Sequence, residues 1–84
     1  MAGTVLLFGR LKDVFGAASI ALPDGVGTAA ELRARLAEVN PDLAEMLRAK
    51  TVRIAVNQEM VANEAGTPVS AIDEIALLPP LSGG

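Results

Sequence analysis

The residues that could do chemistry stand together in the last stretch of the sequence, Pro79-Pro80-Leu81-Ser82-Gly83-Gly84. Glycine has no side chain, so a Gly-Gly tip can approach another backbone closely. The two prolines fix φ and favour an extended chain before the tip. We therefore expect a tail that enters another protein, with the α-carboxylate of Gly84 as the reactive group and Gly83 giving steric access.

Two simpler explanations of the Gly-Gly pair are a frayed chain end and residues added for expression. The preceding residues favour a functional tail instead. Ile75-Ala76-Leu77-Leu78 is a short apolar run, typical of a strand, and it leads directly into Pro79. A strand buried in a core would anchor the tail. We therefore expect a folded domain over residues 1–78 and an extended C-terminal segment over residues 79–84.

Composition excludes most other kinds of chemistry. The chain has 84 residues, enough for one small domain, and contains neither cysteine nor histidine. Disulfides, thiolate metal sites and Ser-His or Cys-His nucleophiles are therefore excluded. A net charge of −3 and only two aromatic residues argue against nucleic acid as a partner. Without an apolar run of membrane length or a signal peptide, we expect a cytoplasmic protein with no membrane partner.

One carboxylate pair, Asp73 and Glu74, could be interpreted as a general acid and base. Adjacent side chains at the start of a strand point to opposite faces, however, so the two carboxylates should not converge. We therefore expect no catalytic side chain, no bound cofactor and no metal site in this chain.

The first half of the sequence predicts two strands and a well-marked helix. Residues 4–9 and 17–22 have strand composition, and the connection over residues 10–15 has room for one helical turn, with Gly16 as its C-cap. Thr28-Ala29-Ala30-Glu31 has the pattern of a capping box. An apolar stripe is expected at Leu32, Leu36 and Val39, and solvated charges on the opposite side at Arg33, Arg35 and Glu38.

The second half predicts a short helix and three more strands. Asn40-Pro41 ends the first helix and can begin another, through Leu43, Met46 and Leu47, that frays near Lys50. Strands are expected at residues 52–56, 60–62 and 75–78, with a turn at 57–59 and a loop at 63–71. The order of elements favours the α+β class, with a mixed sheet of about five strands, one main helix on one face and a short second helix.

Several motifs carry a resemblance to a known family. They are Leu7-Phe8, Leu11-Lys12-Asp13-Val14-Phe15-Gly16, Leu32-Arg33, Ala55-Val56-Asn57-Gln58 and Asp73-Glu74-Ile75-Ala76, followed by the C-terminal segment. With these motifs the sequence resembles the ubiquitin-like β-grasp fold and, within it, the small sulfur-carrying subunits of molybdopterin synthase. The chain departs from that pattern at Leu77 and Leu78, where the family often has aromatics, and at Ile72, where it often has glycine.

The resemblance implies a chemical cycle at Gly84. An E1-like activating enzyme would use ATP to adenylate the terminal carboxylate, and a sulfurtransferase would indirectly supply the sulfur of a thiocarboxylate. The large catalytic subunit of molybdopterin synthase would then receive the tail. There the thiocarboxylate would donate sulfur to cyclic pyranopterin monophosphate, so this chain would be the non-catalytic subunit in molybdenum cofactor biosynthesis.

The resemblance also implies that partners dock on the sheet. Phe8, Met60 and Leu78 match family positions facing the large subunit. Partner contacts are also expected along the tail, at Pro79, Pro80, Leu81 and Ser82, with Leu81 packed at the mouth of the partner's channel. Phe8 and Leu78 could instead be ordinary core residues. Arg10 and Lys12 could pair with acidic partner groups. Three other functions stay open: a thiamine-type sulfur carrier, a ubiquitin-like protein modifier, and a binding module whose tail is incidental.

Overall fold

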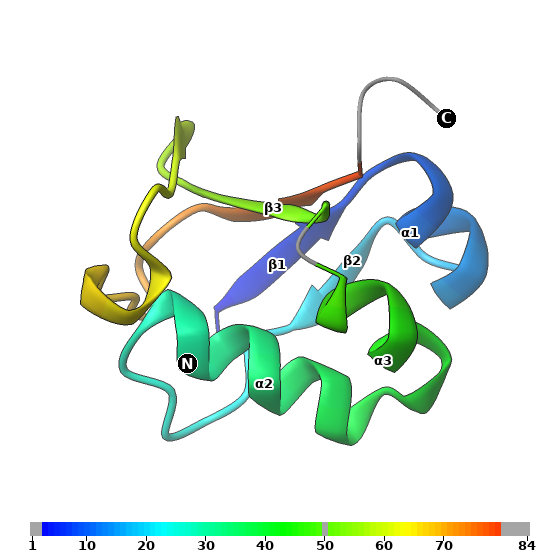
Figure 1. Ribbon diagram of the computed structural model, residues 1–84, viewed down its shortest axis with the longest axis horizontal. Helices are drawn as coiled ribbons and strands as arrows, with labels where there is room; N and C mark the ends of the chain where they lie inside the picture. The colour runs from blue at the N-terminus through cyan, green and yellow to red at the C-terminus, as the bar shows by residue number, and fades with distance from the viewer. Residues whose placement is uncertain (1–2, 50, 80–84) are drawn as a thin grey trace.

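The computed structural model describes residues 3–49 and 51–79 and forms one mixed sheet with helices on one of its faces (Figure 1). In chain order its elements are β1 Thr4–Leu7, α1 Gly9–Phe15, β2 Ser19–Ala21, α2 Ala29–Val39, α3 Pro41–Arg48, β3 Arg53–Val56, β4 Glu59–Met60, the 3-10 helix η1 Glu64–Gly66 and β5 Ile75–Leu78. The strand order is β2-β1-β5-β3-β4. This arrangement confirms the predicted α+β class.

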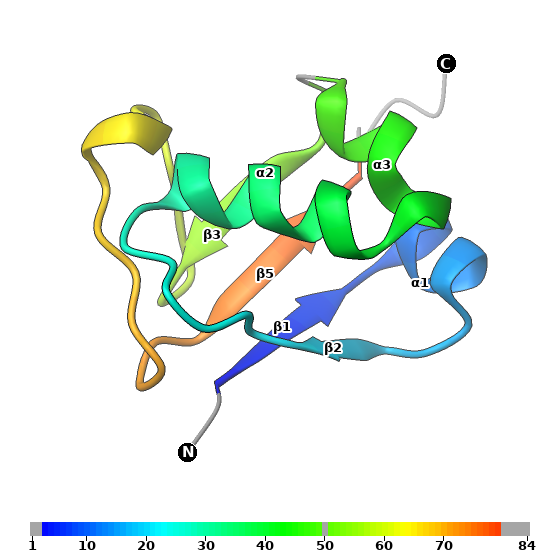
Figure 2. The same cartoon turned by 90° about the horizontal axis from the view of Figure 1, so that it is seen from below.

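The sheet is parallel at its centre and antiparallel elsewhere. β1 pairs with β5 in parallel, with Leu7 opposite Leu77, and the remaining neighbouring strands are antiparallel. Figure 2, seen from the helix side, shows α2 and α3 lying across the strands. The core fills the space between these two layers. Its fully buried large side chains are those of Val5, Leu7, Leu11, Leu32, Leu36, Leu43, Leu47, Val52, Ile54, Ile75 and Leu77.

The local signals at the helix ends are confirmed. The Thr28 hydroxyl accepts from the Glu31 amide at 3.2 Å, and the Glu31 carboxylate accepts from the Thr28 amide at 3.2 Å, which completes the capping box. Helix α3 begins with Pro41 in its first turn. Helix α1 is longer than the single turn expected and ends at Gly16, whose φ of 86° gives the left-handed C-cap.

The β3-β4 hairpin is tighter than expected. Its turn consists of two residues, Asn57 and Gln58, with φ angles of 53° and 69°, and β4 covers Glu59–Met60. Two positive φ values are characteristic of a type I′ turn, whose twist matches that of the paired strands. The expected strand over residues 60–62 therefore begins one residue earlier and is shorter.

Two predictions for α2 were wrong. Val39, expected in the apolar stripe, is 57% exposed, whereas Arg33, expected among solvated charges, is only 8% exposed. The buried positions of α2 are Ala29, Leu32, Arg33, Leu36 and Ala37. The buried face of α2 is thus displaced toward Arg33, because α3 packs on that side of the helix. The backbone carbonyls at the end of α3 have no donors within that helix and need them from elsewhere.

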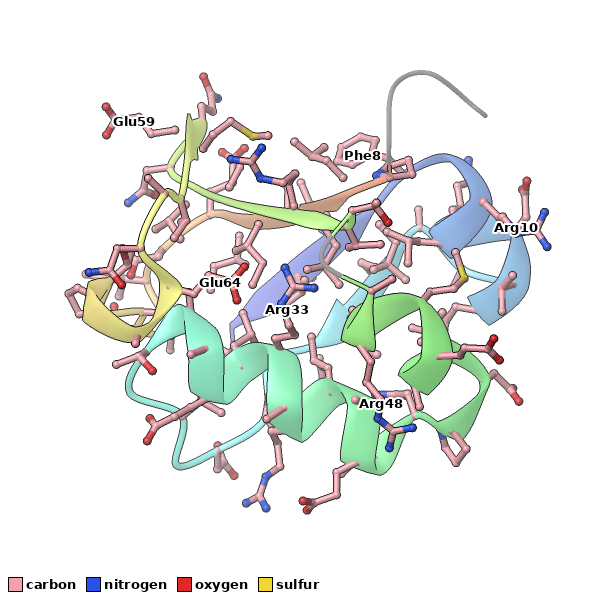
Figure 3. The ribbon with its side chains drawn as sticks, in the orientation of Figure 1. Phe8, Arg10, Arg33, Arg48, Glu59 and Glu64 are labelled. Carbon is pink, nitrogen blue, oxygen red and sulfur yellow. The ribbon has the colours of Figure 1, made fainter. Side chains whose placement is uncertain are left out.

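Arg33 is buried because its donors are satisfied. Its Nη1 donates to the Leu47 carbonyl at 2.6 Å, at the end of α3, and its Nη2 donates to the carbonyl of Val52. The guanidinium also forms an ion pair with Glu64 at 2.6 Å. Figure 3 shows Arg33 and Glu64 pointing toward one another between α2 and the sheet. A paired, hydrogen-bonded charge can be buried at a position where an isolated one could not.

Candidate functional site

The site expected from the sequence begins where β5 ends. Pro79, the last described residue, is half-buried and directly follows Leu78. The predicted functional residues Pro80, Leu81, Ser82, Gly83 and Gly84 lie outside the described residues. What the structure provides is therefore the base from which this segment starts.

That base is rigidly held. β5 lies between β1 and β3 and is hydrogen-bonded to both, and its residues Ile75 and Leu77 are fully buried. Pro79 packs beside Gly9, where a Cβ atom would lie 2.9 Å from the Pro79 Cγ. Gly9 also has a φ of 55°, which favours glycine. The expected buried strand before the C-terminal segment is confirmed. That it anchors residues 79–84 stays a prediction.

The sheet face opposite the helices is not covered by any helix or loop within residues 3–49 and 51–79 (Figure 1). Apolar side chains cross this face in register. Leu6 lies opposite Ala76, Ala76 opposite Ala55, and Ala55 opposite Met60. We call the following set the open-face patch: Leu6, Phe8, Ala55, Met60, Ala76 and Leu78.

The three predicted docking residues of the sheet belong to this patch. Phe8 is 45% exposed and Met60 is 50% exposed, whereas Leu78 is half-buried. Figure 3 shows Phe8 on the face away from the helices, at the end of the sheet where β5 stops. The structure therefore places Phe8 outside the core and keeps Met60 accessible. Docking of a partner here stays a prediction.

Positively charged side chains lie on two elements near this end of the sheet, α1 and β3. Arg10 and Lys12 are exposed on α1, and Arg10 lines, with Pro79, a groove of about 480 Å³. Arg53 on β3 lies directly opposite Leu78. Sequence reasoning missed Arg53, although the period-two alternation of β3 already put it on the same face as Ala55. In the described ranges none of these three cations has an ion pair or side-chain hydrogen bond.

A hydrogen-bonded cluster closes the other end of the sheet. The Asn57 side chain donates to Asp73 at 3.1 Å and accepts from the Glu74 amide at 2.9 Å. The Asn57 side chain and the Ser70 amide, both hydrogen-bonded to Asp73, lower the pKa of its carboxyl. Asp73 therefore holds the β3-β4 hairpin against the start of β5. The sequence motifs around Asn57 and Asp73 thus have a structural role.

Within residues 3–49 and 51–79, no three carboxylates lie close enough together to hold a metal ion. No helix in the same ranges is long and apolar enough to cross a membrane.

Comparison with known proteins agrees with this geometry. The ThiS family model matches residues 5–84. The molybdopterin synthase sulfur carrier subunit of Dictyostelium discoideum is 35% identical over 82 residues, which cover 95% of this chain and 93% of that protein.

Two solved structures share the fold. One belongs to the complex of subunits 1 and 2 of the molybdopterin-converting factor from Helicobacter pylori 26695, with a TM-score of 0.69, 32% identity and 100% of both chains covered. The other is SAMP1, small archaeal modifier protein 1, from Haloferax volcanii, with a TM-score of 0.77, 28% identity and 100% of both chains covered. The chain therefore belongs to the ThiS family of ubiquitin-like β-grasp proteins and is a relative of the molybdopterin synthase sulfur carrier subunits.

Proposed function

We propose that this protein is the sulfur carrier subunit of a molybdopterin synthase. The observation that carries the proposal is that a central strand, paired on both sides, leads at Pro79 directly into the ending Pro-Pro-Leu-Ser-Gly-Gly. The nearly full-length similarity to a sulfur carrier subunit supports the same function. In this proposal Gly84 carries the sulfur and the folded domain holds the C-terminal segment on which Gly84 lies.

The proposed chemistry takes place on the backbone of the chain. A carboxylate is a poor acyl electrophile, so an E1-like enzyme would first transfer AMP from ATP to the Gly84 carboxylate and release pyrophosphate. Sulfur at the oxidation level of hydrosulfide would then attack the carbonyl carbon, displace AMP and leave a thiocarboxylate at Gly84. Donors in the partner's site would stabilise the charge that develops on the carbonyl oxygen. ATP would be bound by the activating enzyme, with no cofactor held by this chain.

The partner in the final step would be the large catalytic subunit of the synthase. The Helicobacter pylori relative was solved as a complex of two subunits of the molybdopterin-converting factor, which supports such a partner. The open-face patch adjoins the base of the C-terminal segment, so one partner could cover the patch while receiving Gly84. In the active site of that partner, the thiocarboxylate at Gly84 would donate its sulfur to cyclic pyranopterin monophosphate.

Intact mass spectrometry tests the carrier chemistry. The protein is incubated with its activating enzyme, ATP and a sulfur source, and a mass gain equal to sulfur minus oxygen is expected, mapped to Gly84. Gly84→Ala and a chain lacking Gly84 should fail to support sulfur transfer, because a Cβ crowds the carbonyl and a shorter tail does not reach the site. Normal transfer by either variant would overturn the proposed role of Gly84.

The similarity to SAMP1 favours a second candidate, a ubiquitin-like protein modifier. In that case Gly84 would form isopeptide bonds with lysines of target proteins. The two functions differ in their products in cells. Covalent adducts on other proteins would support the modifier, whereas a free thiocarboxylate that restores molybdopterin synthesis in a strain lacking its carrier would support the sulfur carrier.

A further inference from the structure

Arg53 brings a positive charge to an otherwise uncharged face of the sheet. Among the described strand residues whose side chains alternate onto the open face, Arg53 alone is charged. It is exposed, and within residues 3–49 and 51–79 it has neither an ion pair nor a side-chain hydrogen bond. The guanidinium is therefore available to a partner.

The register fixes the surroundings of Arg53. It lies directly opposite Leu78, and the Ala55-Met60 pair follows two residues further along β3. Opposed side chains in a sheet have Cβ atoms about 5 Å apart, and residues two positions apart along a strand are about 7 Å apart. A partner that contacts both Leu78 and Met60 therefore covers Arg53 as well.

Covering an unpaired guanidinium would be costly. A charge removed from water without a partner loses its hydration and gains nothing in exchange. Arginine offers a planar fork of donors that matches a carboxylate in a two-bond geometry. A protein that docks on this patch therefore needs a carboxylate opposite Arg53 in order to bind tightly.

We infer that Arg53 determines partner specificity, and that the protein docking on the open-face patch presents an Asp or Glu side chain to it. The inference rests on the proposed function, which identifies that protein as the large synthase subunit. Arg53 would then select large subunits with a matching carboxylate and discriminate against those that carry a cation or an apolar group at that place.

Calorimetric titration with the large subunit from the same organism tests the inference. Arg53→Glu places like charges opposite each other, so we expect its affinity to fall about 30-fold or more. Arg53→Lys keeps the charge and should stay within about tenfold of the wild type. The wild-type affinity should fall as salt is raised, and that dependence should be weaker for Arg53→Glu.

The matched control is Arg35→Glu, the same change on the helix side of the molecule, where Arg35 is exposed and forms an ion pair with Glu38. Its affinity should stay within about twofold of the wild type, since exposed pairs far from an interface contribute little. Equal thermal unfolding midpoints for the three variants would show that folding is not the cause. If Arg53→Glu binds as tightly as Arg35→Glu, the inference is overturned.

Cross-linking gives a second, independent test. A carbodiimide joins a lysine amine directly to a carboxylate with which it forms a salt bridge. In the complex with Arg53→Lys, a cross-link between position 53 and an acidic residue of the large subunit is expected; cross-links elsewhere but none at position 53 would contradict the inference. A wild-type protein that does not bind the large subunit would instead argue against the proposed function.

Discussion

Arg33 and Glu64 form a two-bond ion pair across 31 positions of sequence, with Nε to Oε1 at 2.9 Å and Nη2 to Oε2 at 2.6 Å. The same guanidinium donates to the carbonyls of Leu47 and Val52. Arg33 therefore links α2 to the end of α3, to the chain entering β3 and to η1. One side chain supports the layer of helices against which the anchoring strand β5 is packed.

The first prediction is that Arg33→Ala destabilises the fold by about 3 kcal/mol, since the carbonyls of Leu47 and Val52 lose the donor that Arg33 supplies and the two-bond ion pair with Glu64 is removed. The matched control is Arg35→Ala, because Arg35 forms an exposed pair with Glu38 at 3.4 Å on the same helix. That change should cost no more than about 0.5 kcal/mol. Urea unfolding of both variants measures the difference; equal losses would contradict the structural role of Arg33.

The second prediction concerns pH. Hydrogen bonds from Asn57 and Ser70 lower the pKa of Asp73 in the folded state. A depressed folded-state pKa contributes stability above the unfolded-state value, near 4, and this contribution is lost as pH falls through the folded-state value. Asp73→Asn should therefore be less stable than the wild type at pH 7, and the gap should narrow toward pH 3. An unchanged gap would show that the ionised carboxylate is not what matters.

The third prediction concerns the turn between β3 and β4. Gln58 has a φ of 69°, a conformation that residues other than glycine, asparagine and aspartate rarely adopt. Asn-Gly is the preferred pair for a type I′ turn, so Gln58→Gly should stabilise the protein by about 0.5–1 kcal/mol. Gln58→Ala serves as the control and should give no gain. Chemical denaturation measures both, and a loss of stability in Gln58→Gly would refute the assignment of strain.

The features that could be predicted from the sequence are those that depend on residues close together in the chain. The capping box at Thr28 and Glu31 uses groups three residues apart, and the strand Ile75–Leu78 is marked by its own apolar run and the prolines that follow. Both were predicted with the bounds that the structure has. The family motifs around Asn57 and Asp73 were also recognised, although their structural role appeared only with the hydrogen bonds that join them.

What could not be predicted depends on contacts between distant segments. Helical periodicity placed Arg33 among solvated charges, because nothing near it in sequence shows that the carbonyls of Leu47 and Val52 lie within its reach. Arg53 was missed for a similar reason. Alternation assigns it to a face, but only the pairing of β3 with β5 sets it opposite Leu78 and beside the base of the C-terminal segment.

The fourth prediction tests the open-face patch as the docking surface. Met60 is 50% exposed, so the fold should tolerate a carboxylate at this position in Met60→Asp. A partner covering the patch would have to bury that charge beside the carboxylate that it is expected to present to Arg53, and affinity for the large subunit should fall at least about tenfold. Surface plasmon resonance with the immobilised large subunit measures the loss.

Val39→Asp provides the control for Met60→Asp, since Val39 is also an exposed apolar residue, 57% accessible, but lies on α2 on the other side of the molecule. Its affinity should match the wild type, because α2 lies in the layer that covers the opposite face of the sheet. The two variants thus differ in which layer carries the new charge. A loss only from Val39→Asp would place the docking surface on the helix side. No loss from Met60→Asp, or equal losses from both variants, would contradict docking on the open-face patch.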